Sequence, residues 1–137
     1  MKLSNMENPN RDALVLVTGG TGFVGIHCVL TLLNAGYSVR TTLRKLNRQD
    51  EVVDALRQNN ADGIDNLSFV EADLASDSNW NQAVKDCKYL LHVASPIGIE
   101  KPQDESYFIG PAVEGTLRVL RAARDAGVKR VVLLLRF

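Results

Sequence analysis

The residues of this chain with the clearest chemical use are three glycines at intervals of three, Gly19, Gly22 and Gly25. They follow a short apolar run at residues 15–17 and come directly before an amphipathic helical pattern. The free N–H groups at a helix N-terminus attract phosphate, and glycine lets the backbone come close to it. A strand, a glycine turn and a helix in this order predict a site for the pyrophosphate of a dinucleotide. The alternative is that these glycines belong to an ordinary turn. Their position between a strand and a helix favours the dinucleotide site over that alternative.

The three glycines have different expected roles. Gly19 allows a sharp turn where a Cβ would clash, Gly22 lets N–H groups approach the phosphates closely, and Gly25 brings the helix close to the strand. Phe23 and Val24, at the start of the helix, are expected to bind the cofactor together with the glycines.

A second candidate site follows the strand predicted at residues 38–43. NAD sites carry an acidic residue about 20 positions after the glycines, whereas this chain has Arg44 and Lys45 there. A guanidinium binds a 2′-phosphate through two parallel hydrogen bonds, and the lysine adds a point charge. The sequence therefore predicts that NADP(H) is preferred over NAD(H). The alternative is that Arg44 and Lys45 are simply solvated residues at the end of a strand. Because the glycine turn lies upstream, the phosphate role is favoured over this alternative by about two to one.

Asp73 and Leu74 directly follow the strand predicted at residues 67–71, at the sheet edge where an adenine ring would lie. Asp73 could accept a hydrogen bond from the adenine amino group while Leu74 packs nearby. Asp73 could equally be a turn residue that binds its own backbone. Its position favours the adenine role only slightly.

The elements that must position these residues alternate along the chain between strand and helix patterns. The predicted strands cover residues 13–18, 38–43, 67–71, 88–93 and 130–135. The predicted helices cover residues 24–35, 49–59, 79–86 and 111–126. This alternation predicts an α/β fold with a Rossmann-type, doubly wound parallel sheet. The expected strand order is 3-2-1-4-5, with the ligand crevice between strands 1 and 4 at their carboxyl ends.

Composition predicts one domain. A chain of 137 residues has room for a polar tail at residues 1–12 and a dinucleotide-binding domain at residues 13–137. Its 16 basic and 16 acidic residues cancel, so no bulk charge attracts nucleic acid or a membrane surface. Without a signal peptide or membrane-spanning run, the expected location is the cytoplasm. Cys28 and Cys87 are expected to be reduced core thiols, with no metal site and no disulfide.

Four motifs occur in order along the chain, at residues 18–25 (TGGTGFVG), 72–74 (ADL), 92–96 (HVASP) and 113–116 (VEGT). Together they resemble the extended short-chain dehydrogenase/reductases, and specifically the aldehyde and ketone reductases that are similar to dihydroflavonol-4-reductase. The resemblance runs from about residue 13 to the end of the chain. It implies that Arg44 binds the 2′-phosphate and that Asp73 and Leu74 hold adenine. It also implies that the backbone of Val93, Ala94 and Ser95 lines the nicotinamide-side ribose and the phosphates.

Three other polar side chains near the predicted crevice have no expected catalytic role. His92 lies inside an apolar strand and is expected to be structural. Ser95 has no His or Lys at motif spacing to activate it, so it is expected to form a turn hydrogen bond before Pro96. Thr116 on the long helix could face either the cofactor or the sheet.

The sequence departs from the family in its catalytic residues. These reductases use a Tyr-x-x-x-Lys pair and a Ser at the end of the fifth strand to protonate and polarise a carbonyl. The residues four positions after the three tyrosines are Thr41, Val93 and Pro111, and Arg136 stands where the Ser would align. No catalytic residue is therefore predicted.

The expected function is an NADP(H)-binding Rossmann portion of a carbonyl reductase, without its C-terminal catalytic and substrate region and inactive alone. A non-catalytic NADP(H)-binding sensor or subunit and a truncated gene-model fragment are the alternatives. The fifth strand would form an exposed apolar edge, through which the chain could associate with itself.

Overall fold

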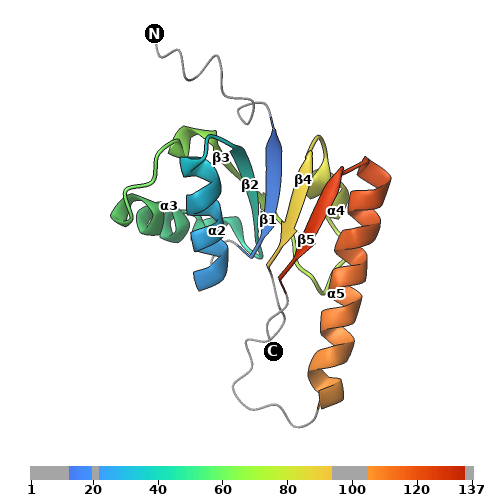
Figure 1. Cartoon of the computed structure of the whole chain (residues 1–137). Coiled ribbons are helices and arrows are strands. Elements are labelled where there is room, and N and C mark those ends of the chain that lie inside the picture. Colours follow the sequence, from blue (N-terminus) through green and yellow to red (C-terminus); the bar gives the residue numbers. More distant parts are fainter. Residues whose placement is uncertain (1–12, 20–21, 94–104, 135–137) are drawn as a thin grey trace.

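The polypeptide folds around a five-stranded parallel sheet in the order β3-β2-β1-β4-β5 (Figure 1). The computed structural model describes residues 13–19, 22–93 and 105–134, with the backbone alone for residues 105–113. The strands are β1 (Leu14–Thr18), β2 (Ser38–Leu43), β3 (Leu67–Glu71), β4 (Tyr89–His92) and β5 (Arg130–Leu133). The predicted α/β class and strand order are confirmed. The predicted tail at residues 1–12 lies outside the described residues.

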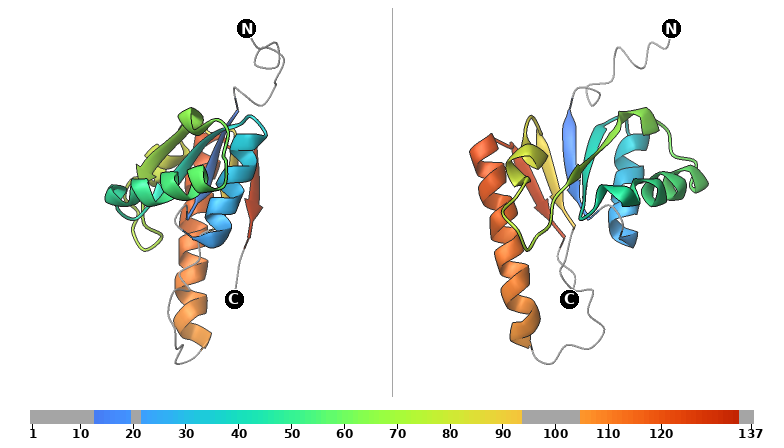
Figure 2. Two further views of the ribbon diagram at one scale, coloured as in Figure 1. Left: turned by 90° about the vertical axis from the view of Figure 1, so that its left-hand side faces the viewer. Right: turned by 180° about the vertical axis from the view of Figure 1, so that it is seen from behind.

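Helices cover both faces of the sheet (Figure 2). One face is covered by α2 (Phe23–Asn34) and α3 (Gln49–Gln58), the other by α4 (Trp80–Val84) and α5 (Glu105–Ala126). Two short 3-10 helices, η1 (Leu46–Arg48) and η2 (Ile64–Asn66), precede α3 and β3. Within the described ranges, no helix combines the length and apolar character needed to cross a membrane.

The alternation of side chains along β1 divides the core into two clusters. Val15 and Val17 pack with α2 and α3, whereas Leu16 packs with α4 and α5. Leu16 and Val17 are fully buried, and each such side chain contributes about 1.5–3 kcal/mol relative to exposure. The central strand is therefore apolar on both faces, as expected for a parallel sheet covered on both sides.

The end of α2 shows how local sequence shapes the fold. Gly36 has φ +94, and its N–H donates to the Leu33 carbonyl at 3.0 Å. The Tyr37 N–H donates to the Leu32 carbonyl at 3.0 Å, which completes a Schellman motif. The predicted helix end at Gly36 is confirmed, with Ala35 as the C-cap immediately before it.

The start of α5 differs from the sequence prediction. The helix begins at Glu105, so residues 105–110, which precede the predicted helix, are helical and Pro111 lies inside the helix. The prediction placed Pro111 at the first helical position, where proline is common in helices. An interior proline removes one N–H donor and its ring crowds the carbonyl four residues earlier, yet the helix of 22 residues continues across it. The other boundaries differ from prediction by at most two residues.

An apolar strand lies at one edge of the described sheet. On β5, Val132 is 48% and Leu133 is 42% exposed. Neither α2 nor α3 extends over this end of the sheet (Figure 1). The exposed apolar edge therefore matches expectation, and self-association through it stays a prediction.

We expect Val132→Lys to weaken any self-association of the chain, because a lysine on an edge strand opposes pairing with a second strand. Light scattering over a concentration series measures the mass. Leu46→Lys, at a half-exposed leucine on η1 away from this edge, is the matched control and should leave the mass unchanged. An unsubstituted chain that is monomeric at every concentration would contradict the prediction.

Candidate functional site

The glycine turn lies at the carboxyl end of β1, the strand that lies between β2 and β4 in the sheet. Gly19 has φ +81, a conformation that residues with a Cβ rarely adopt. Its N–H donates to Thr42 Oγ1 at 3.2 Å, and its carbonyl accepts the Gly22 N–H at 3.1 Å. The turn is thus anchored both to the neighbouring strand and to the start of α2. The sharp turn expected at Gly19 is present.

The N-terminus of α2 opens toward this turn. No described side chain caps the helix at its N-cap residue Gly22, and its first turn contains no acidic residue. The helix supplies no acceptor for the N–H groups of Phe23, Val24 and Gly25, which carry the positive end of its dipole. Gly25 is buried, as close packing of helix and strand requires. This geometry fits an anion such as a pyrophosphate.

Gly22 is not required by the backbone or by packing within the described residues. Its φ of −79 and ψ of 159 are open to any residue, and an added Cβ would meet only the Gly19 carbonyl oxygen, at 3.6 Å. Gly22 is also exposed. A glycine there leaves free space in front of the helix N-terminus, which fits its predicted role toward phosphates.

A buried histidine ties the strand ends beside the turn to α5. His92 Nδ1 lies 2.9 Å from Thr18 Oγ1, and His92 Nε2 lies 3.3 Å from Thr116 Oγ1. The Val93 N–H also donates to Thr18 Oγ1, at 3.0 Å. Burial lowers the pKa of His92 to about 4, so the imidazole is neutral at pH 7. The geometry supports the structural interpretation of His92, and Thr116 faces the sheet.

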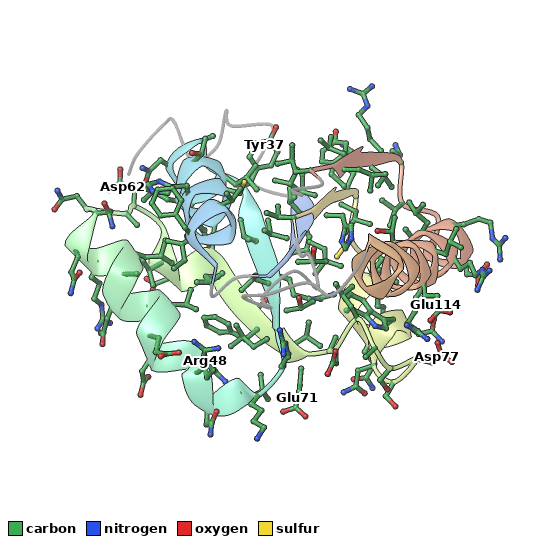
Figure 3. The ribbon with its side chains drawn as sticks, turned by 90° about the horizontal axis from the view of Figure 1, so that it is seen from below. Tyr37, Arg48, Asp62, Glu71, Asp77 and Glu114 are labelled. Atoms are coloured by element: carbon green, nitrogen blue, oxygen red, sulfur yellow. The ribbon has the colours of Figure 1, made fainter. Side chains whose placement is uncertain are left out.

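The basic residues predicted to bind a 2′-phosphate are both exposed. Arg44 and Lys45 follow β2, the strand next to β1. The next residue, Leu46, donates its N–H to Glu71 Oε2 at 3.3 Å, which ties this segment to the end of β3. Figure 3 shows Glu71 on this edge of the molecule, seen from below the view of Figure 1. Arg44 and Lys45 would be exposed whether they bind a 2′-phosphate or are only solvated. Their exposure does not distinguish the two interpretations, and the NADP(H) preference stays a prediction.

Asp73 forms the turn that was one of its two interpretations. Its Oδ1 accepts the Ala75 N–H at 3.0 Å, and the residue is exposed. A carboxylate accepts several hydrogen bonds, so this turn is compatible with an adenine contact. Leu74 is half-buried against the core cluster shared by α4 and α5. Both residues lie at the carboxyl end of β3, as the prediction requires.

The nicotinamide side of the predicted site is described only in part. Val93 directly follows β4 and is half-buried, whereas Ala94 and Ser95 lie outside the described residues. Cys28 and Cys87 are both free thiols. Cys87 is buried in the core, as expected, whereas Cys28 is only half-buried, and burial raises the pKa of each thiol.

Sequence reasoning missed several side chains that support this edge of the sheet. Arg40 on β2 donates through Nη1 to the carbonyls of Ala83 and Lys85, both at 2.8 Å, and so satisfies acceptors at the end of α4. Trp80 and Arg118 bind the backbone that follows β3. These contacts carry no motif. The charged residue Arg40 inside a predicted strand is the one signal that could have been followed.

Comparison with known proteins identifies the family. The model of the NAD dependent epimerase/dehydratase family matches residues 15–135. The chain belongs to this family. It is similar to dihydroflavonol 4-reductase of Hordeum vulgare, with 40% identity over 119 residues, 86% of this chain and 33% of that protein. It is also similar to a ketoreductase of Cercospora beticola, with 38% identity over 128 residues, 89% of this chain and 36% of that protein.

Solved reductases share the fold. The yeast methylglyoxal/isovaleraldehyde reductase Gre2, complexed with NADPH, matches with a TM-score of 0.71 and 28% identity, over 88% of this chain and 36% of that chain. Vestitone reductase from alfalfa matches with a TM-score of 0.66 and 32% identity, over 88% and 35%. The family resemblance drawn from four short motifs is confirmed. The chain spans about one third of the length of these relatives.

Gly19 and Gly22 should respond differently to substitution. We expect Gly19→Ala to lower the free energy of unfolding by about 1–2 kcal/mol, because alanine is strained at a positive φ. Gly22→Ser should change it by less than about 0.5 kcal/mol, because serine is a favourable N-cap residue. Urea unfolding of both variants measures the difference. Equal losses would show that Gly22 is needed by the fold after all.

The buried histidine predicts a pH dependence of stability. Above pH 6.5 His92 is neutral in both states. Between pH 6.5 and 4 the unfolded chain takes up a proton that the folded chain does not, which removes about 3 kcal/mol from the free energy of unfolding. Urea unfolding from pH 7 to 4 measures this slope. The His92→Gln variant has no titrating group at this position, so its free energy of unfolding should fall less between pH 7 and 4. An equal fall in the variant and the unsubstituted chain would contradict the prediction.

Proposed function

We propose that these residues bind NADP(H) and form the cofactor-binding portion of a carbonyl reductase. The observation that carries this proposal is the uncapped N-terminus of α2, which meets the glycine turn at the carboxyl end of β1. Ligands of doubly wound sheets bind at such a point, where the strand order reverses. Relatives with NADPH in their solved structures support the choice of cofactor.

The cofactor would lie across the carboxyl edge of the sheet. Its pyrophosphate would accept hydrogen bonds from the N–H groups at the start of α2, with the glycines leaving room for it. Arg44 and Lys45 would bind the 2′-phosphate, and Asp73 and Leu74 the adenine. The nicotinamide-side ribose would lie along the backbone of Val93, Ala94 and Ser95.

The chemistry that the cofactor supplies when bound is hydride transfer. The names of the similar proteins, a dihydroflavonol 4-reductase and a ketoreductase, support an aldehyde or ketone substrate for the whole protein. No tyrosine in the 137 residues is followed four positions later by lysine. We therefore assign cofactor binding to the 137 residues and name no proton donor among them. A non-catalytic NADP(H) sensor or subunit is the second candidate.

Calorimetric titration with NADPH and NADH tests the proposal. Arg44→Ala should weaken NADPH more than NADH by about 1.5–3 kcal/mol, because it removes a charge-assisted hydrogen bond to the 2′-phosphate. Arg48→Ala is the matched control, since Arg48 lies on nearby η1, is exposed and pairs with Glu51. Gly22→Ser should weaken both cofactors alike, because both carry the pyrophosphate.

Two results would contradict the proposal at different points. No NADPH binding by the unsubstituted chain at mid-micromolar concentration would overturn cofactor binding altogether. Equal losses of NADPH and NADH in Arg44→Ala would overturn the phosphate role of Arg44 and leave the dinucleotide site in place. Turnover of NADPH with a panel of aldehydes by these 137 residues would overturn the assignment of no catalytic group.

A further inference from the structure

The segment that follows β3 is held by a side chain from α5. The guanidinium of Arg118 donates through Nη1 to the Leu74 carbonyl and through Nε to Asp77 Oδ1. The Arg118 side chain is only 23% exposed, whereas that of Asp77 is 90% exposed. Figure 3 shows Asp77 close to α5, which is seen end-on. One arginine side chain therefore binds two acceptors of this segment, which the forked geometry of a guanidinium permits.

The backbone of α5 also touches the same segment. Gly115 is buried, and a Cβ built on it would lie 3.0 Å from Leu74 Cβ. That distance is shorter than ordinary van der Waals contact, so the helix approaches Leu74 as closely as a glycine allows. Gly115 and Arg118 are three residues apart, which places them on one side of the helix. Leu74 is thus held at its side chain and at its carbonyl by the same helix.

A tryptophan from α4 completes the support. Trp80 is 3% exposed, and its Nε1 donates to the carbonyls of Asp73 and Ser76, both at 3.0 Å. Asp73 Oδ1 also accepts the Ala75 N–H. The backbone on both sides of Leu74 is therefore bound by Trp80, and the Asp73 carboxylate is bound within the segment itself.

We propose that Arg118 is a positioning residue for the adenine half of the cofactor site. By binding the Leu74 carbonyl and the Asp77 carboxylate, it holds Asp73 and Leu74 where they meet the adenine ring. The inference rests on the proposed NADP(H) site and adds that α5 helps to set its affinity. Arg118 itself need not touch the cofactor.

The test uses 2′,5′-ADP, the adenine half of NADP(H), beside NADPH. Arg118→Met keeps an apolar stem and removes both hydrogen bonds. It should weaken both ligands by the same factor of about five, a size typical of residues that act through another residue. Arg124→Met is the matched control, because Arg124 lies on the same helix, is exposed and pairs only with its neighbour Asp125 among the described residues. Calorimetry measures the affinities.

Amide hydrogen exchange of the free protein supplies a readout that needs no cofactor. The Ala75 and Ser76 N–H groups both donate to Asp73, at 3.0 Å each, and should exchange faster in Arg118→Met. Arg118→Lys retains a donor and should recover part of both effects. Asp77→Asn leaves the bond to Leu74 in place and should show the smaller loss.

The outcomes separate this inference from the proposed function. If the unsubstituted chain binds neither ligand, the NADP(H) site is wrong and this inference falls with it. If it binds both and Arg118→Met binds them equally well, only the positioning role is overturned. A variant that loses thermal stability yet keeps its affinities and its exchange at residues 75–76 also overturns it, since Arg118 would then be merely structural.

Discussion

The connection from β1 to α2 constrains most of the structure. A strand buried on both faces must turn within a few residues into a helix that packs back on one of those faces. Gly19 makes that turn with φ +81, and Thr42 on β2 anchors its N–H. Because the turn leaves no described side chain in front of α2, the positive end of the helix remains available to an anion.

The elements around this turn are joined by polar contacts at the same edge of the sheet. His92 contacts Thr18 at the end of β1 and Thr116 on α5. Arg118, on the same helix, binds the segment after β3. In this way α5 is in contact with the carboxyl ends of two strands that are not neighbours in the sheet. A nucleotide across that edge would meet residues whose positions depend on one helix.

Local patterns predicted much of this arrangement. The apolar run at residues 15–17 and the glycines that follow α2 and α5, Gly36 and Gly127, are short-range signals, and the structure follows them. The predicted start of α5 was wrong: the helix was expected to begin at Pro111, a residue type common at the first helical position, whereas it begins at Glu105. Asp73 was predicted either as an adenine contact or as a turn residue, and the structure shows the turn hydrogen bond; its support from Trp80 emerged only from the fold.

The sequence by itself determined the family, the order of the strands and the place of the glycine turn, because spacing of glycines and periodicity of apolar residues act over a few positions. Tertiary structure decided what holds the site. Thr42 lies 23 residues from Gly19, and Arg118 lies 44 residues from Leu74. Such pairs have no spacing to recognise, since they meet only when sheet and helices pack together.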